Sequence, residues 1–233
     1  MDDDDMLPSV SERGSPHGSP TASDDEDGGP SIIQHRARII ECLSDMMAQS
    51  LQAMQEYFSN HDDYTALSEK DQKTLFQASI MEILIVKCFF TYRQGRFYTD
   101  QGVEIISRET LLLGTNDQTF VNGFFDFFSQ MERLNFSEEQ ALILMSISMF
   151  DPNRVEIVHL DEPDRVRNLF NKYIAELSAS LPTSGLLLRS SLKDLKSGFK
   201  DILMRSSTNP MVDLGENVYN FLSMMTNSAR WQQ

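Results

Sequence analysis

The stretch Tyr57-Phe-Ser-Asn-His-Asp-Asp-Tyr-Thr-Ala-Leu-Ser-Glu-Lys-Asp-Gln-Lys-Thr-Leu-Phe76 decides the fold of this chain. A helix is expected to end in its first half, because the short polar side chains of residues 59–63 compete for backbone hydrogen bonds. Ser68, with an acid three residues later, is typical of the N-cap of a new helix. That helix continues into residues 78–90, which are apolar on nearly every face, so it must be enclosed by protein. Residues 83–86 could also form a buried strand, but the unbroken continuation from the capped segment favours a helix.

Outward from this stretch, the sequence predicts more helices. Before it, Ile39, Leu43, Met46 and their successors to Phe58 form one apolar stripe at helical spacing. After it, two glycines flank an aromatic pair in residues 95–102 and predict one small hairpin with residues 103–106. Helical patterns then return, with a capping box at Ser137 and a helix start near Asp161. Further helices are expected over these ranges: 120–131, 141–150, 164–177, 188–203 and, more weakly, 212–225.

Composition narrows the possible functions. The chain has 233 residues and a formal charge of -15, which disfavours binding of nucleic acid through bulk electrostatics. Its two cysteines exclude a disulfide framework and a zinc site with four thiolates. No nucleotide-binding, hydrolase or metalloprotease motif is present, so we expect no enzyme activity and no cofactor. The N-terminus is acidic, unlike a signal peptide, and we expect neither a membrane span nor a membrane partner.

Two further features of the composition concern the domain organisation and the interior of the fold. Residues 1–30 carry Pro, Gly, Ser and acids with little to bury, so we expect a disordered acidic segment followed by one domain over residues 31–233. Thirteen methionines, many on predicted inner faces, indicate either adaptable core packing or a pliable apolar cavity for a hydrophobic ligand.

The order of these segments resembles the ligand-binding domain of nuclear hormone receptors. Tyr64, Leu67, Asp71 and Gln72, followed by Leu75, hold the positions of the family signature, and residues 134–154 are close to a later family motif that ends in Pro-Asp-Arg. The resemblance covers residues 33–210 and is nearest to the vitamin D/ecdysone-type branch, which includes nematode bile-acid-like steroid receptors. It implies an all-α, three-layer antiparallel helical sandwich with one small β-hairpin.

The resemblance also implies functional positions. The ligand-binding residues it implies are Met46, Met47, Ser50, Met54, Met81, Leu84, Lys87, Cys88 and Phe97. The coregulator groove it implies comprises Ser59, Asp71, Gln72, Leu75, Phe76, Gln77 and Glu216. For dimerisation it implies the outer face of a helix bearing Leu186, Leu187, Arg189 and Lys193. The implied partners are a small hydrophobic ligand, coregulator proteins and another receptor or a second copy, and the implied location is the nucleus, with exchange to the cytoplasm.

Some family features are missing from the sequence. Two cysteines cannot form the family's zinc-containing DNA-binding module, so we expect no direct DNA contact from this chain, which is either a fragment or a receptor without that module. The lysine that clamps coactivator peptides is replaced by Ser59, and Gln77 stands at a second basic position. We therefore expect weak coactivator recruitment and a role in repression or as an inactive dimer partner. An alternative is a ligand-independent helical scaffold whose pocket is filled by its own side chains.

Overall fold

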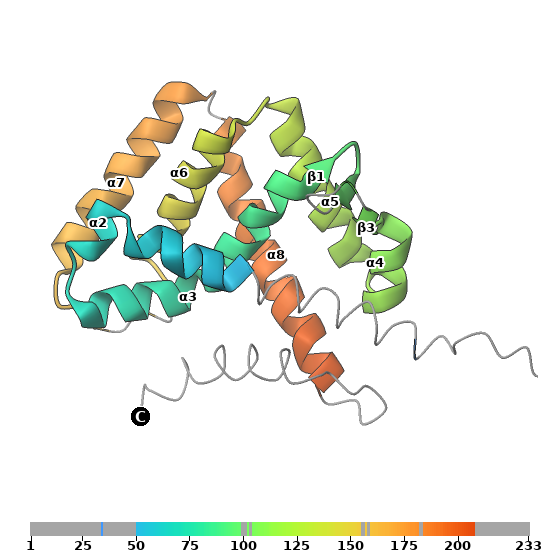
Figure 1. Cartoon of the computed structure of the whole chain (residues 1–233), viewed down its shortest axis with the longest axis horizontal. Coiled ribbons are helices and arrows are strands. Elements are labelled where there is room, and N and C mark those ends of the chain that lie inside the picture. Colours follow the sequence, from blue (N-terminus) through green and yellow to red (C-terminus); the bar gives the residue numbers. More distant parts are fainter. Residues whose placement is uncertain are drawn as a thin grey trace, which may run out of the picture.

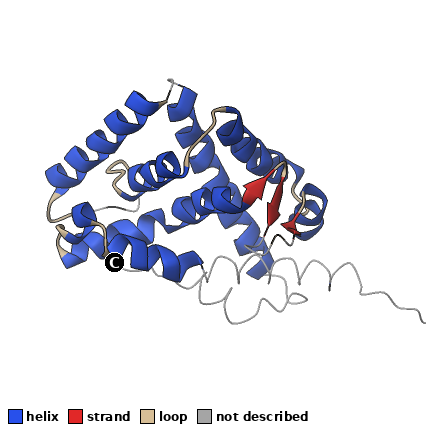
Figure 2. Cartoon of the chain, turned by 45° about the horizontal axis from the view of Figure 1, so that its top comes forward, coloured by secondary structure: helices blue, strands red, loops and turns tan. Residues whose placement is uncertain are grey.

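Helices make up most of the chain in the computed structural model, which describes residues 34, 50–98, 102, 104–154, 157, 159–181 and 184–207 (Figures 1 and 2). After a helix over residues 50–59, the elements are α2 (Asp62–Thr65), α3 (Glu69–Lys87), η1 (Cys88–Thr91), β1 (Tyr92–Arg93), β2 (Arg96–Tyr98), β3 (Glu104–Ile106), α4 (Arg108–Thr115), α5 (Gln118–Arg133), α6 (Glu138–Met149), α7 (Pro163–Ser180) and α8 (Ser184–Ser207). The predicted all-α fold with its small sheet is confirmed. The acidic segment 1–30 and the weak helix predicted over 212–225 lie outside the described residues.

Helix α3 begins at the edge of the domain, and its second half, residues 78–86, is buried in the interior. Ser68 caps its start by accepting a hydrogen bond from the backbone N–H of Asp71, and residues 83–86 are helical, which settles the alternative of a strand. The helix packs against α6 and α8, while α6 packs against α7 and α5 against α8. By length and composition alone, Glu69–Thr91 would suffice to cross a membrane, but most of it is buried inside the domain. Its apolar surface is explained by the helices around it.

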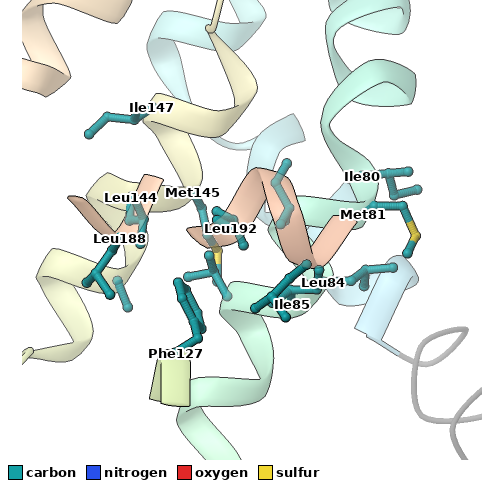
Figure 3. Packing of buried hydrophobic residues seen from close by; sticks show 14 of the residues in the cluster. Ile80, Met81, Leu84, Ile85, Phe127, Leu144, Met145, Ile147, Leu188 and Leu192 are labelled. Atoms are coloured by element: carbon teal, nitrogen blue, oxygen red, sulfur yellow. The ribbon is translucent and has the colours of Figure 1, made fainter. Parts of the chain in front are cut away.

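The main core lies where α3, α5, α6 and α8 meet. Leucine, isoleucine, methionine and phenylalanine side chains from these helices are buried there, and those of Phe127, Leu144, Met145, Leu188 and Leu192 lie close together (Figure 3). The labelled members of this group are Ile80, Met81, Leu84, Ile85, Phe127, Leu144, Met145, Ile147, Leu188 and Leu192. Most of them are fully buried, and burial of such side chains is the main favourable term in folding.

The small sheet has three antiparallel strands rather than the single hairpin predicted. Strands β2 and β3 form the expected hairpin, and β1 adds a third strand through a two-residue turn at Gln94 and Gly95. Both turn residues have positive φ, as a tight hairpin turn of type I′ requires, and glycine supplies that conformation at no steric cost. The sequence signal for β1 was weak because it is only two residues long.

Asp71 joins α3 to the start of α7. Its carboxylate accepts hydrogen bonds of 2.8 Å from the backbone N–H groups of Asp161 and Glu162, and its side chain is completely buried. These N–H groups belong to the N-cap of α7, Glu162, and to the residue before it, where no helical carbonyl is available to them. The buried carboxylate therefore gives partners to two part-buried donors, and these donors in turn satisfy its charge.

A second buried acid, Glu82, forms an ion pair with Arg154, and both side chains are 3% exposed. Arg154 also donates to the backbone carbonyls of Ala78, at 2.9 Å, and Ser148, at 2.6 Å. The guanidinium group thus connects the middle of α3 to the end of α6 and the loop after it.

A third buried acid, Asp151, lies just after α6 and is 1% exposed. It pairs with Arg189 at 2.6 Å and Lys193 at 3.0 Å, both on α8. Burial acts to raise the pKa of Asp151, but the hydrogen bonds from Arg189, the backbone of Asn153 and Lys193 outweigh it and lower the pKa to about 2. Helix α8 is therefore held to the end of α6 by charge as well as by apolar packing.

We predict that Asp71→Asn lowers the free energy of unfolding by about 2–3 kcal/mol, because an amide offers one oxygen acceptor in place of two. Urea unfolding of the full chain measures this change. Asp164→Asn, at a carboxylate whose side chain is 88% exposed, is the matched control and should change stability by less than about 0.5 kcal/mol. Equal effects of the two variants would contradict the proposed link.

We predict that Asp151→Asn destabilises the chain by about 2 kcal/mol at neutral pH and much less in acid. The folded-state pKa is lowered from the usual 3.8, so the stability that the carboxylate contributes is present above pH 3.8 and is lost as the pH falls toward about 2. Denaturant unfolding of wild type and variant between pH 7 and pH 2 measures the difference. A difference that stays constant over this range would contradict the ion-pair explanation, and Asp194→Asn on exposed α8 surface serves as control.

Candidate functional site

Most of the described positions of the predicted ligand site lie in the apolar interior. Met54, Met81 and Leu84 are 5%, 1% and 1% exposed and belong to the same hydrophobic cluster, while Ser50 is half-buried at the start of the described part of its helix. Met46 and Met47 lie outside the described residues. Long, unbranched methionine side chains change rotamer easily, so this part of the interior can adapt its shape.

Phe97 lies in a cluster of aromatic rings between the sheet and α5. Its ring centroid is 5.0 Å from those of Tyr92 and Phe128, 5.3 Å from Phe124 and 5.6 Å from Phe125. The hydroxyl of Tyr92 hydrogen-bonds Ser129 at 2.9 Å, which gives its polar end a partner. The side chain of Phe97 is 1% exposed and is surrounded by protein on several sides.

Lys87 and Cys88 lie at the end of α3 and are both half-buried. The ammonium of Lys87 is 4.8 Å from the centroid of the Phe90 ring, a cation–π contact, whereas the acid of α3, Glu82, pairs with Arg154 instead. The thiol of Cys88 donates to the carbonyl of Leu84, and burial raises its pKa to about 12. The thiol therefore stays protonated and is not a nucleophile at neutral pH.

The predicted coregulator positions divide into surface and interior residues. Ser59 is exposed and Gln77 is half-buried, whereas Leu75 is completely buried and Phe76 is 9% exposed. Gln72 is half-buried, and its amide donates to the carbonyl of Leu67 at 2.7 Å. Glu216 lies outside the described residues.

The hydrogen bonds of two groove residues thus serve the local fold. Asp71 holds the start of α7, and Gln72 holds the turn between α2 and α3. These two residues of the predicted coregulator groove therefore also fix the local backbone. Its partners at Asp161 and Glu162 were not identified from the sequence, because they lie 90 residues further along the chain.

The predicted dimerisation positions lie on α8. Leu187 is 68% exposed, while the side chain of Leu186 is outside the described part of the structure. Arg189 and Lys193 both pair with Asp151, and the guanidinium of Arg189 lies 4.6 Å from the centroid of the Phe170 ring. The sequence predicted Asp151 only as a helix stop before Pro152, so its ion pairs with α8 were missed.

Among the residues that the structure describes, no group of three or more His, Cys, Asp and Glu side chains is arranged to hold a metal ion.

Comparison with known proteins agrees with this arrangement. The family model described as the ligand-binding domain of nuclear hormone receptor matches residues 30–182, which is more than half of the chain. The chain is 22% identical over 169 residues to the nuclear hormone receptor E75 of Metapenaeus ensis, a match that covers 71% of this chain and 28% of that protein. It therefore spans little more than a quarter of the length of this relative. By its sequence match and its helical architecture, the chain belongs to the family of nuclear hormone receptor ligand-binding domains.

Proposed function

We propose that this chain binds a small hydrophobic molecule, steroid-like or lipid-like, and regulates transcription in the nucleus through coregulators and a receptor partner. The observation that carries the proposal is the common position of Met54, Met81 and Leu84. They come from two helices of a fold whose family is defined by ligand binding, and they lie in one continuous apolar interior. Apolar cavities with a few polar groups are the usual sites of such ligands.

Lys87 is the proposed contact for the polar end of the ligand. Its ammonium is half-buried at the end of α3 and lies against the Phe90 ring rather than against an acid of its own helix. A half-buried cation gains from an anionic or hydroxyl partner, because its hydration is incomplete. A carboxylate or hydroxyl on the ligand would supply that partner.

A second candidate function is a ligand-independent scaffold. The observation in its favour is the environment of Phe97, whose ring is already enclosed by Tyr92, Phe124, Phe125 and Phe128. Side chains that fill the space near the sheet leave less room for a ligand. In this reading the chain acts through its surfaces alone, as an interaction scaffold or a dimer partner of a receptor.

For a receptor partner or a second copy, we place the contact at the outer face of α8. Leu187 is a large apolar residue of α8 whose side chain is exposed. Arg189 and Lys193 each form an ion pair with Asp151. In the proposed contact, their remaining N–H donors bind the partner and define the direction from which it approaches.

Native mass spectrometry and a thermal-shift panel of steroids and fatty acids on the full chain separate the two functions. We predict that a bound lipid raises the melting temperature and that Lys87→Met abolishes this rise while the unliganded melting temperature stays within a few degrees. A ligand at one hundred times its dissociation constant adds about 2.7 kcal/mol to the stability of the native state. Lys200→Met, on the exposed side of α8, is the matched control. If no lipid co-purifies and none raises the melting temperature, the scaffold function replaces the ligand function.

For coregulators, we predict weak binding of LxxLL peptides to the natural chain and a gain of roughly tenfold to one hundredfold in Ser59→Lys. A lysine at this exposed position would meet the negative C-terminal end of the peptide helix, an interaction of about 1–3 kcal/mol. Fluorescence anisotropy with LxxLL and corepressor-type peptides measures the effect, and Asn171→Lys on exposed α7 carries the same charge change elsewhere. Tight LxxLL binding to the natural chain would contradict the argument from the missing lysine.

A further inference from the structure

Basic side chains form a stripe along one side of α8. Positions separated by four, three and four residues lie on one face of a helix, and here they hold Arg189, Lys193, Lys196 and Lys200. At 1.5 Å per residue, this basic stripe is about 16 Å long. The helix packs on the core through a different set of positions: Leu188, Leu192, Leu195, Phe199 and Ile202. Four cations in one stripe contrast with the formal charge of -15 on the whole chain.

The first half of the basic stripe presents positive charge to the solvent. Arg189 and Lys193 share one carboxylate, that of Asp151, at 2.6 and 3.0 Å. This carboxylate is 1% exposed, whereas the side chains of Arg189 and Lys193 are 28% and 45% exposed. The negative charge therefore lies inside the domain, and two cations around one acid leave a positive charge at the surface. A partner that approaches this side of α8 meets N–H donors before it meets the acid.

The second half of the basic stripe is positive as well. The ammonium of Lys196 donates to the backbone carbonyl of Ala78 at 3.2 Å, and Lys200 is exposed with no ion pair among the residues that the structure describes. Two acids of α8, Asp194 and Asp201, each directly follow a lysine of the stripe. Neighbouring positions on a helix point about 100° apart, so these acids do not face the stripe.

An acidic segment of matching length is present in the same chain. Residues 1–30 hold nine acids and one basic residue, Arg13, and four of the acids form the run Asp24-Asp-Glu-Asp27. Four residues in extended form span at most about 14 Å, close to the length of the basic stripe. Contacts between exposed charges are individually weak, but covalent attachment raises the effective concentration of the segment at the stripe. Charge, length and attachment together favour this segment over a separate acidic protein.

We propose that the basic stripe of α8 is a docking surface for the acidic segment 1–30 of the same chain, with residues 24–27 opposite the four cations. The contact is reversible and is strongest at low salt, because it joins exposed charges. Arg189 and Lys193 also belong to the proposed receptor contact, so the docked segment excludes a receptor partner from this part of α8. That competition rests on the proposed function, whereas the docking itself does not.

Carbodiimide cross-linking of the full chain, followed by peptide mass spectrometry, tests the proposal. The reagent joins a lysine amine directly to a carboxylate, so it links groups that are in contact. We expect links from residues 24–27 to Lys193 and Lys200 at least tenfold more often than to Lys70, whose side chain is 57% exposed. These links should be lost in 1 M NaCl, where the Debye length is about 3 Å. Mixed ¹⁴N and ¹⁵N chains distinguish links within one chain from links between two copies.

Single-charge variants of the full chain test the stripe itself. Lys193→Gln should lower the links to Lys200, and Lys200→Gln those to Lys193, each about threefold. Lys70→Gln makes the same change on α3 and should leave both unchanged. A variant with residues 24–27 neutralised to Asn-Asn-Gln-Asn gives a measurement without cross-linking. Its ¹⁵N NMR spectrum should differ from that of the natural chain at the amides of residues 189–200 and not at those of α6.

Three results would overturn the proposal. The first is equal linking to the stripe lysines and Lys70, or no change in the two stripe variants. The second is linking only between labelled and unlabelled chains, which assigns the stripe to a second copy. The third is an absence of links while single-stranded DNA of 20 bases or phosphatidylserine vesicles protect Lys193 and Lys200 from acetylation, which assigns the stripe to phosphate groups.

Discussion

The ion pair between Glu82 and Arg154 is the interaction on which the arrangement of the domain depends. Both charges are almost fully removed from water, and loss of one partner from such a pair typically costs 3–5 kcal/mol because the other is left buried and uncompensated. Arg154 also donates to one backbone carbonyl of α3 and one of α6, and Lys196 of α8 donates to the same carbonyl of Ala78. The guanidinium group therefore joins α3 to α6, and the Ala78 carbonyl beside it also receives a hydrogen bond from α8; the apolar side chains of Figure 3 come from these helices and from α5.

Helix α3 contributes to two proposed sites, one near each of its ends. Asp71 near its start secures α7 beside the proposed coregulator groove, while the far end carries Lys87 and Cys88 beside the proposed ligand site. Between them, residues 78–86 are buried on every side, so α3 cannot turn about its axis without exposing apolar surface. The two proposed sites are therefore held at a fixed separation by one helix.

The fold was predictable from the sequence where local signals were strong, and the pairing of distant residues was not. Helical periodicity and the N-cap patterns at Ser68 and Ser137 predicted the helices, and both N-caps are present in the structure. The two-residue strand β1 is too short to produce a period, and the partner of Asp71 lies 90 residues away. Contacts between distant residues were equally unpredictable on the surface of α8. Arg189 and Lys193 were assigned to a dimer face on sequence position, but their bonds to Asp151 depend on where α8 lies relative to the end of α6.

The ring cluster around Phe97 has a consequence for the motions of the domain. Four aromatic neighbours enclose this ring at centroid distances of 5.0–5.6 Å, and close-packed interiors leave little free volume. A half-turn of the Phe97 ring therefore requires its neighbours to separate briefly. The frequency of such ring flips measures how often the space between the sheet and α5 expands. The same expansion would admit a molecule to this space.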